Sequence, residues 1–169
     1  MNNKLKQFLG ALHWLALFTF SFYGLVINKS SFDKVYLIIT VLWLISINLL
    51  KGECFWSYFI KKYKNSDYEA GTKIMDLDDM NLNIDFFKNI LEKHGSVIFL
   101  TFFVIYSFSL YIVLKRNNFN ISFSLLLPIL LIANMILYRT KIDNENVYTS
   151  LQYGFAIIFS WFGINIIKK

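Results

Sequence analysis

The chain has 169 residues, of which 56% are hydrophobic and only 17% are charged, against about 25% charged residues in soluble domains. A soluble core of this size cannot bury so many large apolar side chains, which excludes an ordinary soluble domain and favours a protein that lies in a bilayer. The net charge of +6 comes from lysines that flank apolar runs, so it indicates membrane flanking and no nucleic-acid partner.

Five apolar segments are long enough to cross a bilayer, which takes about 20 helical residues. They cover residues 8–27, 35–53, 96–114, 121–138 and 150–167. The second segment is short unless it continues toward Cys54. The sequence predicts an all-α integral membrane protein: a single membrane domain formed by a helical bundle of five transmembrane helices, with four spans as the alternative.

The first segment carries His13 about two turns into the predicted span. Gly10, His13, Leu17, Ser21 and Gly24 share helical spacing, and small residues on one face let helices approach closely in lipid. In the last segment the equivalent residues are Gln152, Ala156, Ser160 and Gly163. We expect both stripes to be helix-packing surfaces. A cleaved signal peptide is the alternative for the first segment, although its length favours a span.

Residues 54–95 form the predicted cytosolic loop, an amphipathic helical segment between the second and third spans. It opens with "CFWSYFIKKYKN", in which Trp56, Lys61, Lys62 and Lys64 suit anchoring at an anionic membrane interface. "NSDYEAGTK" predicts a turn with Gly71 at positive φ. The acidic residues 76–83 lack the glycine and glutamate of a calcium loop, so a solvated turn is expected. Residues 84–95 predict a second amphipathic helix.

The start of this loop resembles a family of small uncharacterised multi-pass membrane proteins. In that family a helix ends in a Gly/Asn-Glu-Cys turn, followed by Ser or Thr, by Tyr or Leu, and by a basic stretch. The matching residues here are Gly52, Glu53, Cys54, Ser57, Tyr58, Lys61, Lys62, Tyr68 and Gly71. The resemblance implies a small polytopic membrane protein, and it carries no activity with it.

The distribution of Lys and Arg predicts the orientation. With the N-terminus in the cytosol, eleven of these residues lie on the cytosolic side and six on the other side. Five spans then place the C-terminus on the opposite side of the membrane. In this orientation each span brings a polar group toward the cytosolic side, and the opposite ends show no such gathering. The members of this predicted cytosolic-side polar cluster are His13, Glu53, Cys54, His94, Asn134 and Gln152.

Three classes of function remain open. A non-enzymatic channel, transporter-like protein or membrane-complex subunit is favoured, with copies of itself or other membrane subunits as partners in the bilayer; no catalytic residue is assigned. His13 and His94 could instead ligate haem iron, or bind a transition metal together with Cys54. Alternatively, Cys54 could act as a nucleophile with a histidine base in a small membrane enzyme. Asp, Glu, Lys and Arg are absent from the predicted span interiors, which argues against a proton pump or a voltage sensor.

Overall fold

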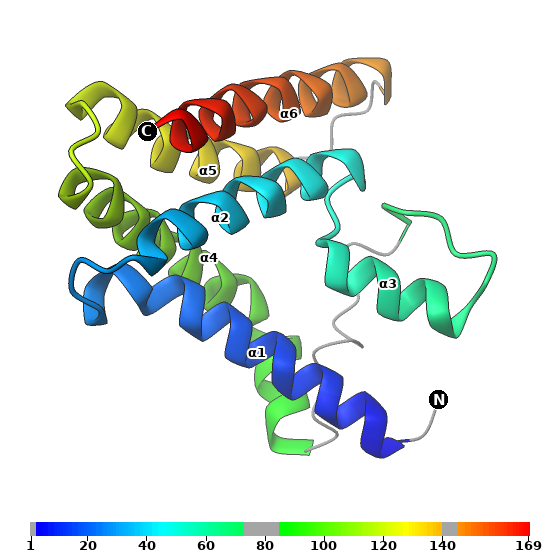
Figure 1. Ribbon diagram of the computed structural model, residues 1–169. Coiled ribbons are helices and arrows are strands. Elements are labelled where there is room, and N and C mark those ends of the chain that lie inside the picture. Colours follow the sequence, from blue (N-terminus) through cyan, green and yellow to red (C-terminus); the bar gives the residue numbers. More distant parts are fainter. Residues whose placement is uncertain (1–2, 73–84, 140–144) are drawn as a thin grey trace.

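The computed structural model describes residues 3–72, 85–139 and 145–169, and these form six helices (Figure 1). In chain order they are α1 (Asn3–Val26), α2 (Phe32–Leu49), α3 (Phe55–Lys64), α4 (Asp85–Arg116), α5 (Ile121–Arg139) and α6 (Glu145–Lys168). All but α3 are long and apolar enough to cross a membrane. The predicted fold class, an all-α protein with five membrane-spanning helices, is confirmed.

Helix α2 ends at Leu49 and does not continue to residue 53. The backbone turns left-handed at Lys51, with φ 52°, and at Gly52, with φ 99°. The Gly52 N–H donates to the Ile47 carbonyl at 2.8 Å, which is the Schellman arrangement that closes a helix. The helix reaches 18 residues because it begins at Phe32, earlier than the apolar run suggested.

Two other boundaries differ from the predicted ones. The amphipathic helix expected at residues 84–95 and the span expected at 96–114 are parts of one 32-residue helix, α4. Helix α6 begins at Glu145, which precedes the predicted start at residue 150. The acidic residues 76–83 lie outside the described residues.

The helices pack in pairs, and most of the buried apolar side chains form one main core. Helix α1 lies along α4, α2 lies along α6, and α5 contacts both α4 and α6. The core is built from fully buried side chains of α2, α4, α5 and α6, including Leu44, Leu110, Leu127, Phe159 and Phe162.

The crossing of α1 and α4 depends on small residues, as the first stripe predicts. A Cβ atom on Gly24 would lie 2.2 Å from the Ser109 carbonyl oxygen, so only glycine fits there. The Gly24 N–H also donates to Ser109 Oγ at 2.7 Å, and Ser21 is fully buried. In the second stripe, Gly163 faces Val41 of α2, whereas Ser160 is exposed and bonds its own helix at Ala156.

Helices α1 and α2 diverge from the turn that joins them, like the arms of a V, with α3 at the wide end (Figure 1). We call the narrow side the closed end and the wide side the open end. At the closed end the C-terminal residues contact the start of α2 and the turn between α4 and α5. Lys34 Nζ donates to the Ile167 carbonyl at 3.0 Å, and Lys169 Nζ donates to the Asn118 carbonyl. The N-terminal half of α1 lies at the open end, so the two termini lie at opposite ends of the bundle (Figure 1).

The closed end gathers polar groups, contrary to the expectation that it would have none. Asp33 is 1% exposed and accepts hydrogen bonds from Arg116 Nε at 2.8 Å, Asn117 Nδ2 at 2.7 Å and Tyr23 OH at 2.9 Å. The positions of Asp33 and Arg116 in the sequence could have predicted this polar cluster. Asp33 lies just before the predicted second span and Arg116 just after the third, so the five-span topology already places both residues on one side of the membrane.

Candidate functional site

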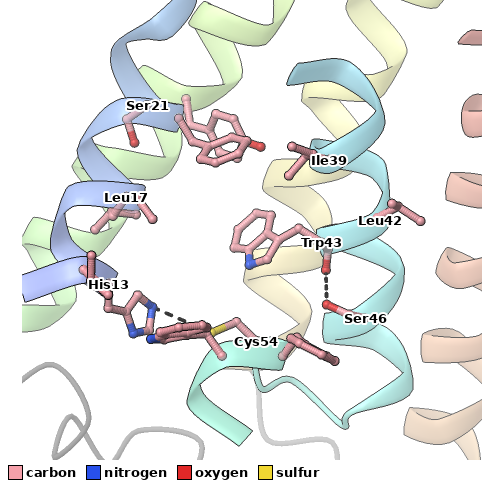
Figure 2. Close-up of a pocket in the computed structure, with 14 residues that line it drawn as sticks. His13, Leu17, Ser21, Ile39, Leu42, Trp43, Ser46 and Cys54 are labelled. Atoms are coloured by element: carbon pink, nitrogen blue, oxygen red, sulfur yellow. Dashed lines mark hydrogen bonds between the residues drawn. The ribbon is translucent and has the colours of Figure 1, made fainter. Parts of the chain in front are cut away.

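A cavity of about 680 Å³ lies between the arms of the V (Figure 2). We call it the α1–α2 cavity. Apolar and aromatic side chains from α1, α2, α4 and the start of α3 form most of its wall: Leu12, Ala16, Leu17, Phe20, Ile39, Leu42, Trp43, Phe55, Trp56 and Tyr106. Four smaller polar side chains complete the lining: His13, Ser21, Ser46 and Cys54.

His13 and Cys54 meet at the open end of this cavity (Figure 2). Cys54 Sγ lies 3.7 Å from His13 Nε2, although the two residues are 41 positions apart in the chain. Both side chains are half-buried. A thiol and an imidazole at this separation can share the thiol proton.

Helix α1 is held so that His13 faces the cavity. Trp14, the next residue, is buried against α4, with its ring 6.3 Å from Phe99 and 6.1 Å from Phe102. His13 and Leu17 are one helical turn apart and both line the cavity (Figure 2). Packing of Trp14 on α4 therefore sets the rotation of α1 that turns His13 inward.

Cys54 is held by its place at the start of α3. It is the N-cap residue, with extended backbone at φ −71° and ψ 148°, and its Sγ accepts the Ser57 N–H at 3.3 Å. An N-cap side chain satisfies one of the first backbone N–H groups of a helix, which have no partner within the helix. The sulfur is therefore oriented by two hydrogen-bonding groups, one from α3 and one from α1.

Glu53 points away from the cavity and stabilises the turn between α2 and α3 instead. It is 2% exposed, and its Oε1 accepts Lys61 Nζ at 2.9 Å and the Tyr68 hydroxyl. Burial, and then this hydrogen bond to Glu53, raise the pKa of the Tyr68 hydroxyl above its ordinary value. Gly71 takes φ 86°, as predicted, where a Cβ would lie 2.6 Å from the Lys51 Cβ. The loop after α3 is thus packed on the turn before it.

The predicted interfacial anchors lie on different sides of α3. Lys61 is only 6% exposed and pairs with Glu53, so it does not reach a membrane surface. Lys62 and Lys64 are exposed, and Lys62 Nζ donates to the Tyr68 carbonyl at 3.1 Å. Trp56 is 41% exposed and belongs to an open aromatic face that also includes Phe55, Phe59 and Tyr63.

The remaining members of the predicted cluster, His94, Asn134 and Gln152, are not among the residues that line the α1–α2 cavity. His94 is on an exposed face of α4. Asn134 and Gln152 are buried. Tyr138, on the same helix as Asn134, donates to Asn48 Oδ1 at 2.8 Å, which links α5 to α2. Within the described residues, Asn134 Nδ2 and Oδ1 and Gln152 Nε2 have no hydrogen-bond partner.

The described part of the chain holds no group of three or more His, Cys, Asp or Glu side chains that could bind a metal ion. His13 and Cys54 would supply two ligands, fewer than the three or four protein ligands of a typical zinc site. Haem or metal binding stays a prediction from the sequence.

Sequence reasoning missed most of the cavity wall. Ile39, Leu42, Trp43 and Ser46 come from one face of α2. Their spacing of three and four residues is visible in the sequence and marks a single helix face. Nothing in the sequence distinguishes a face that lines a cavity from one that packs on another helix.

No protein-family model, curated protein or solved structure matches this chain. The site is therefore interpreted from its own geometry: an apolar cavity with a thiol–imidazole pair at one end.

Proposed function

We propose that this polytopic membrane protein binds a single-chain, acyl-type lipid in the α1–α2 cavity, with the polar end of the ligand beside His13 and Cys54. The lining of the cavity carries the proposal, because most of it is apolar, Ser21 and Ser46 being small polar exceptions, and the imidazole and the thiol lie together at one end. Its volume of about 680 Å³ falls within the 300–1,000 Å³ that is usual for small-molecule sites.

We expect the cavity to open toward the surrounding bilayer. Two of its wall residues on α2 are also surface residues, with Ile39 43% and Leu42 59% exposed. On α1 the wall runs from Leu12 to Ser21, about 14 Å at the helical rise of about 1.5 Å per residue. An alkyl chain could enter sideways from the bilayer and lie along α1.

Contacts at the polar end of the cavity must determine whether such a ligand binds there or stays in the bilayer. Bilayer hydrocarbon is as apolar as the cavity wall, so moving an alkyl chain between them brings little hydrophobic gain. Close packing and polar contacts to His13 and Cys54 must supply the preference. The proposal therefore concerns a ligand with a polar head, such as a carboxylate or a carbonyl group.

That the protein is a channel, a transporter-like protein or a complex subunit, assembled with copies of itself or with other membrane subunits, stays a prediction from the sequence. Ion paths are lined by rings of carbonyl groups or charged side chains. The described lining of the α1–α2 cavity includes no Asp, Glu, Lys or Arg, which supports an apolar ligand more than an ion.

Photolabelling tests the proposal. The full chain, in nanodiscs, would be irradiated with a fatty acid that carries a diazirine on its alkyl chain, and labelled peptides would be mapped. Wild-type labelling should map to the cavity wall and should be competed by unlabelled fatty acid. Ala16→Trp should fill the cavity from α1 and weaken competition about tenfold, a loss of about 1.4 kcal/mol.

Ile157→Trp is the matched control, since Ile157 is 70% exposed on α6 and is not a cavity residue. It should leave labelling and competition unchanged. Labelling that does not saturate, or that is the same in Ala16→Trp as in the wild type, would show that the cavity holds only bulk lipid and would refute the proposal.

A further inference from the structure

We propose that Cys54 accepts an acyl group: its thiol takes the acyl chain of a long-chain acyl thioester, with His13 as the general base, and the chain then occupies the α1–α2 cavity. This inference rests on the proposed function, because the same cavity holds the alkyl chain. It adds a covalent step and names the chemical class of the donor.

The first support is the pairing of the two side chains. Cys54 Sγ and His13 Nε2 are 3.7 Å apart, which is within reach for a sulfur hydrogen bond. A nucleophile beside a base is the usual arrangement for covalent catalysis, and apo structures often show it slightly loose. The Ser57 N–H, 3.3 Å from Sγ, is placed to stabilise negative charge on the sulfur.

The second support is the position of this pair relative to the cavity. Both side chains line the open end, while mostly apolar residues, with Ser21 among them, line the space beyond them (Figure 2). A ligand whose alkyl chain fills the cavity would bring the carbon atom at its polar end to the thiol. A carbonyl carbon at that place is the electrophile that a thiolate attacks.

The step balances without an oxidant or a reductant. His13 Nε2 accepts the Cys54 thiol proton, and Sγ forms a bond to the carbonyl carbon of the donor. The bond from that carbon to the donor sulfur then breaks, and the leaving thiolate takes the proton from His13. One thioester is consumed and one is formed, so the reaction is close to thermoneutral.

Helix α3 offers stabilisation for the intermediate. The first backbone N–H groups of a helix have no partner within the helix. In α3 these groups belong to Phe55 and Trp56, the two residues that follow the N-cap residue Cys54. Such N–H groups stabilise the oxyanion that forms during acyl transfer. The exposed Lys51 precedes this helix start and the exposed Lys62 lies in the last turn of α3, and their charge suits a donor with an anionic carrier group.

A purely structural Cys54 would only cap α3, and Cys54→Ser separates the two roles. Serine is a good N-cap residue, so the variant should keep α3 folded. It cannot form a thioester, which neutral hydroxylamine cleaves while leaving an oxygen ester largely intact. The two roles therefore predict different results in one variant.

The test incubates the purified full chain in nanodiscs with palmitoyl-coenzyme A and follows the intact protein by mass spectrometry. The wild type should gain one acyl group, located on Cys54 and removed by hydroxylamine. Cys54→Ser should gain none. His13→Asn should acylate at least about a hundredfold more slowly, the lower range for loss of a general base. His94→Asn, a histidine on an exposed face of α4, should acylate at the wild-type rate.

Photolabelling of the same variants separates this inference from the proposed function. If wild type and Cys54→Ser both bind the photoreactive fatty acid but the wild type forms no thioester, acyl acceptance is refuted and acyl binding stands. If His13→Asn or Ala16→Trp is acylated at the same rate as the wild type, the acylation is non-specific, and this outcome also refutes the inference. Absence of saturable labelling in the wild type refutes the proposed function itself.

Discussion

Glu53 and Cys54 are neighbours in the chain, yet their side chains serve different parts of the molecule. Extended backbone at Cys54 turns consecutive side chains to opposite sides. Cys54 therefore faces the cavity, while Glu53 enters a buried ion pair with Lys61 at 2.9 Å. Burial of both charges makes the pair sensitive, because removing one partner leaves the other charge in an apolar environment.

Glu53→Gln should loosen the α2–α3 turn. It removes the negative charge opposite Lys61 and weakens the acceptor for Tyr68, and loss of one partner of a buried ion pair costs about 3–5 kcal/mol. Hydrogen exchange of the α3 amides should become markedly faster. Asp67→Asn, which changes an exposed acid in the loop after α3, should leave exchange unchanged. Equal exchange in Glu53→Gln and the wild type would mean that the pair does not brace the turn.

At the scale of elements, the crossing of α1 and α4 sets the shape of the cavity. Gly24 and Ser109 allow the two backbones to approach near the closed end, and Trp14 packs on α4 further along α1. The sequence predicted a packing stripe on α1, and the structure confirms it for Ser21 and Gly24. His13, which shares the spacing, lies instead at the edge of the contact and faces the cavity.

Gly24→Ala should destabilise the protein. The added Cβ would lie 2.2 Å from a backbone oxygen, so α1 must move away from α4, and overpacking of this kind costs about 1–3 kcal/mol. Gly154→Ala is the control, because a Cβ at Gly154 of α6 meets nothing within 4 Å, and alanine is the better helix former. Unfolding of purified protein in mixed micelles should show a loss for Gly24→Ala and no loss for Gly154→Ala. Equal stabilities would show that the crossing is not tight.

For the whole molecule, five spans put the termini at opposite ends of the bundle, and the Lys/Arg bias predicts which end is cytosolic. Asp33, Arg116 and the C-terminal lysines gather at the closed end, which this bias places outside. The predicted orientation would place the His13–Cys54 pair on the cytosolic side, where a water-soluble thioester donor would reach it.

Single cysteines in a Cys54→Ser background should report this orientation in cells. Asn28→Cys and Lys168→Cys, at the closed end, should react with a membrane-impermeant maleimide added outside. Ser66→Cys, after α3, should react only after permeabilisation. The reverse pattern of labelling would show that the Lys/Arg distribution predicts the wrong orientation. Reaction of Asn28→Cys and Ser66→Cys from one side would mean that α2 does not span.

The sequence by itself determined the class of protein, the five apolar helices and the turn at Gly71. These features depend on local composition and on the length that a bilayer demands, so they can be recognised without knowing which helices touch. Helix ends were less certain, as α2 shows, because a Schellman turn at Lys51 and Gly52 closes the helix inside a run that could have continued.

Only the tertiary structure decided which polar groups meet. His13 and Cys54 are brought together, Glu53 and Lys61 are paired away from them, and Asn134 and Gln152 are enclosed elsewhere. These outcomes depend on the rotation and crossing of α1, α2 and α4, which follow from contacts between residues far apart in the chain, such as Gly24 with Ser109. Spacing along one helix cannot reveal them, because it fixes a side chain's direction relative to its own axis and not the position of the neighbouring helix.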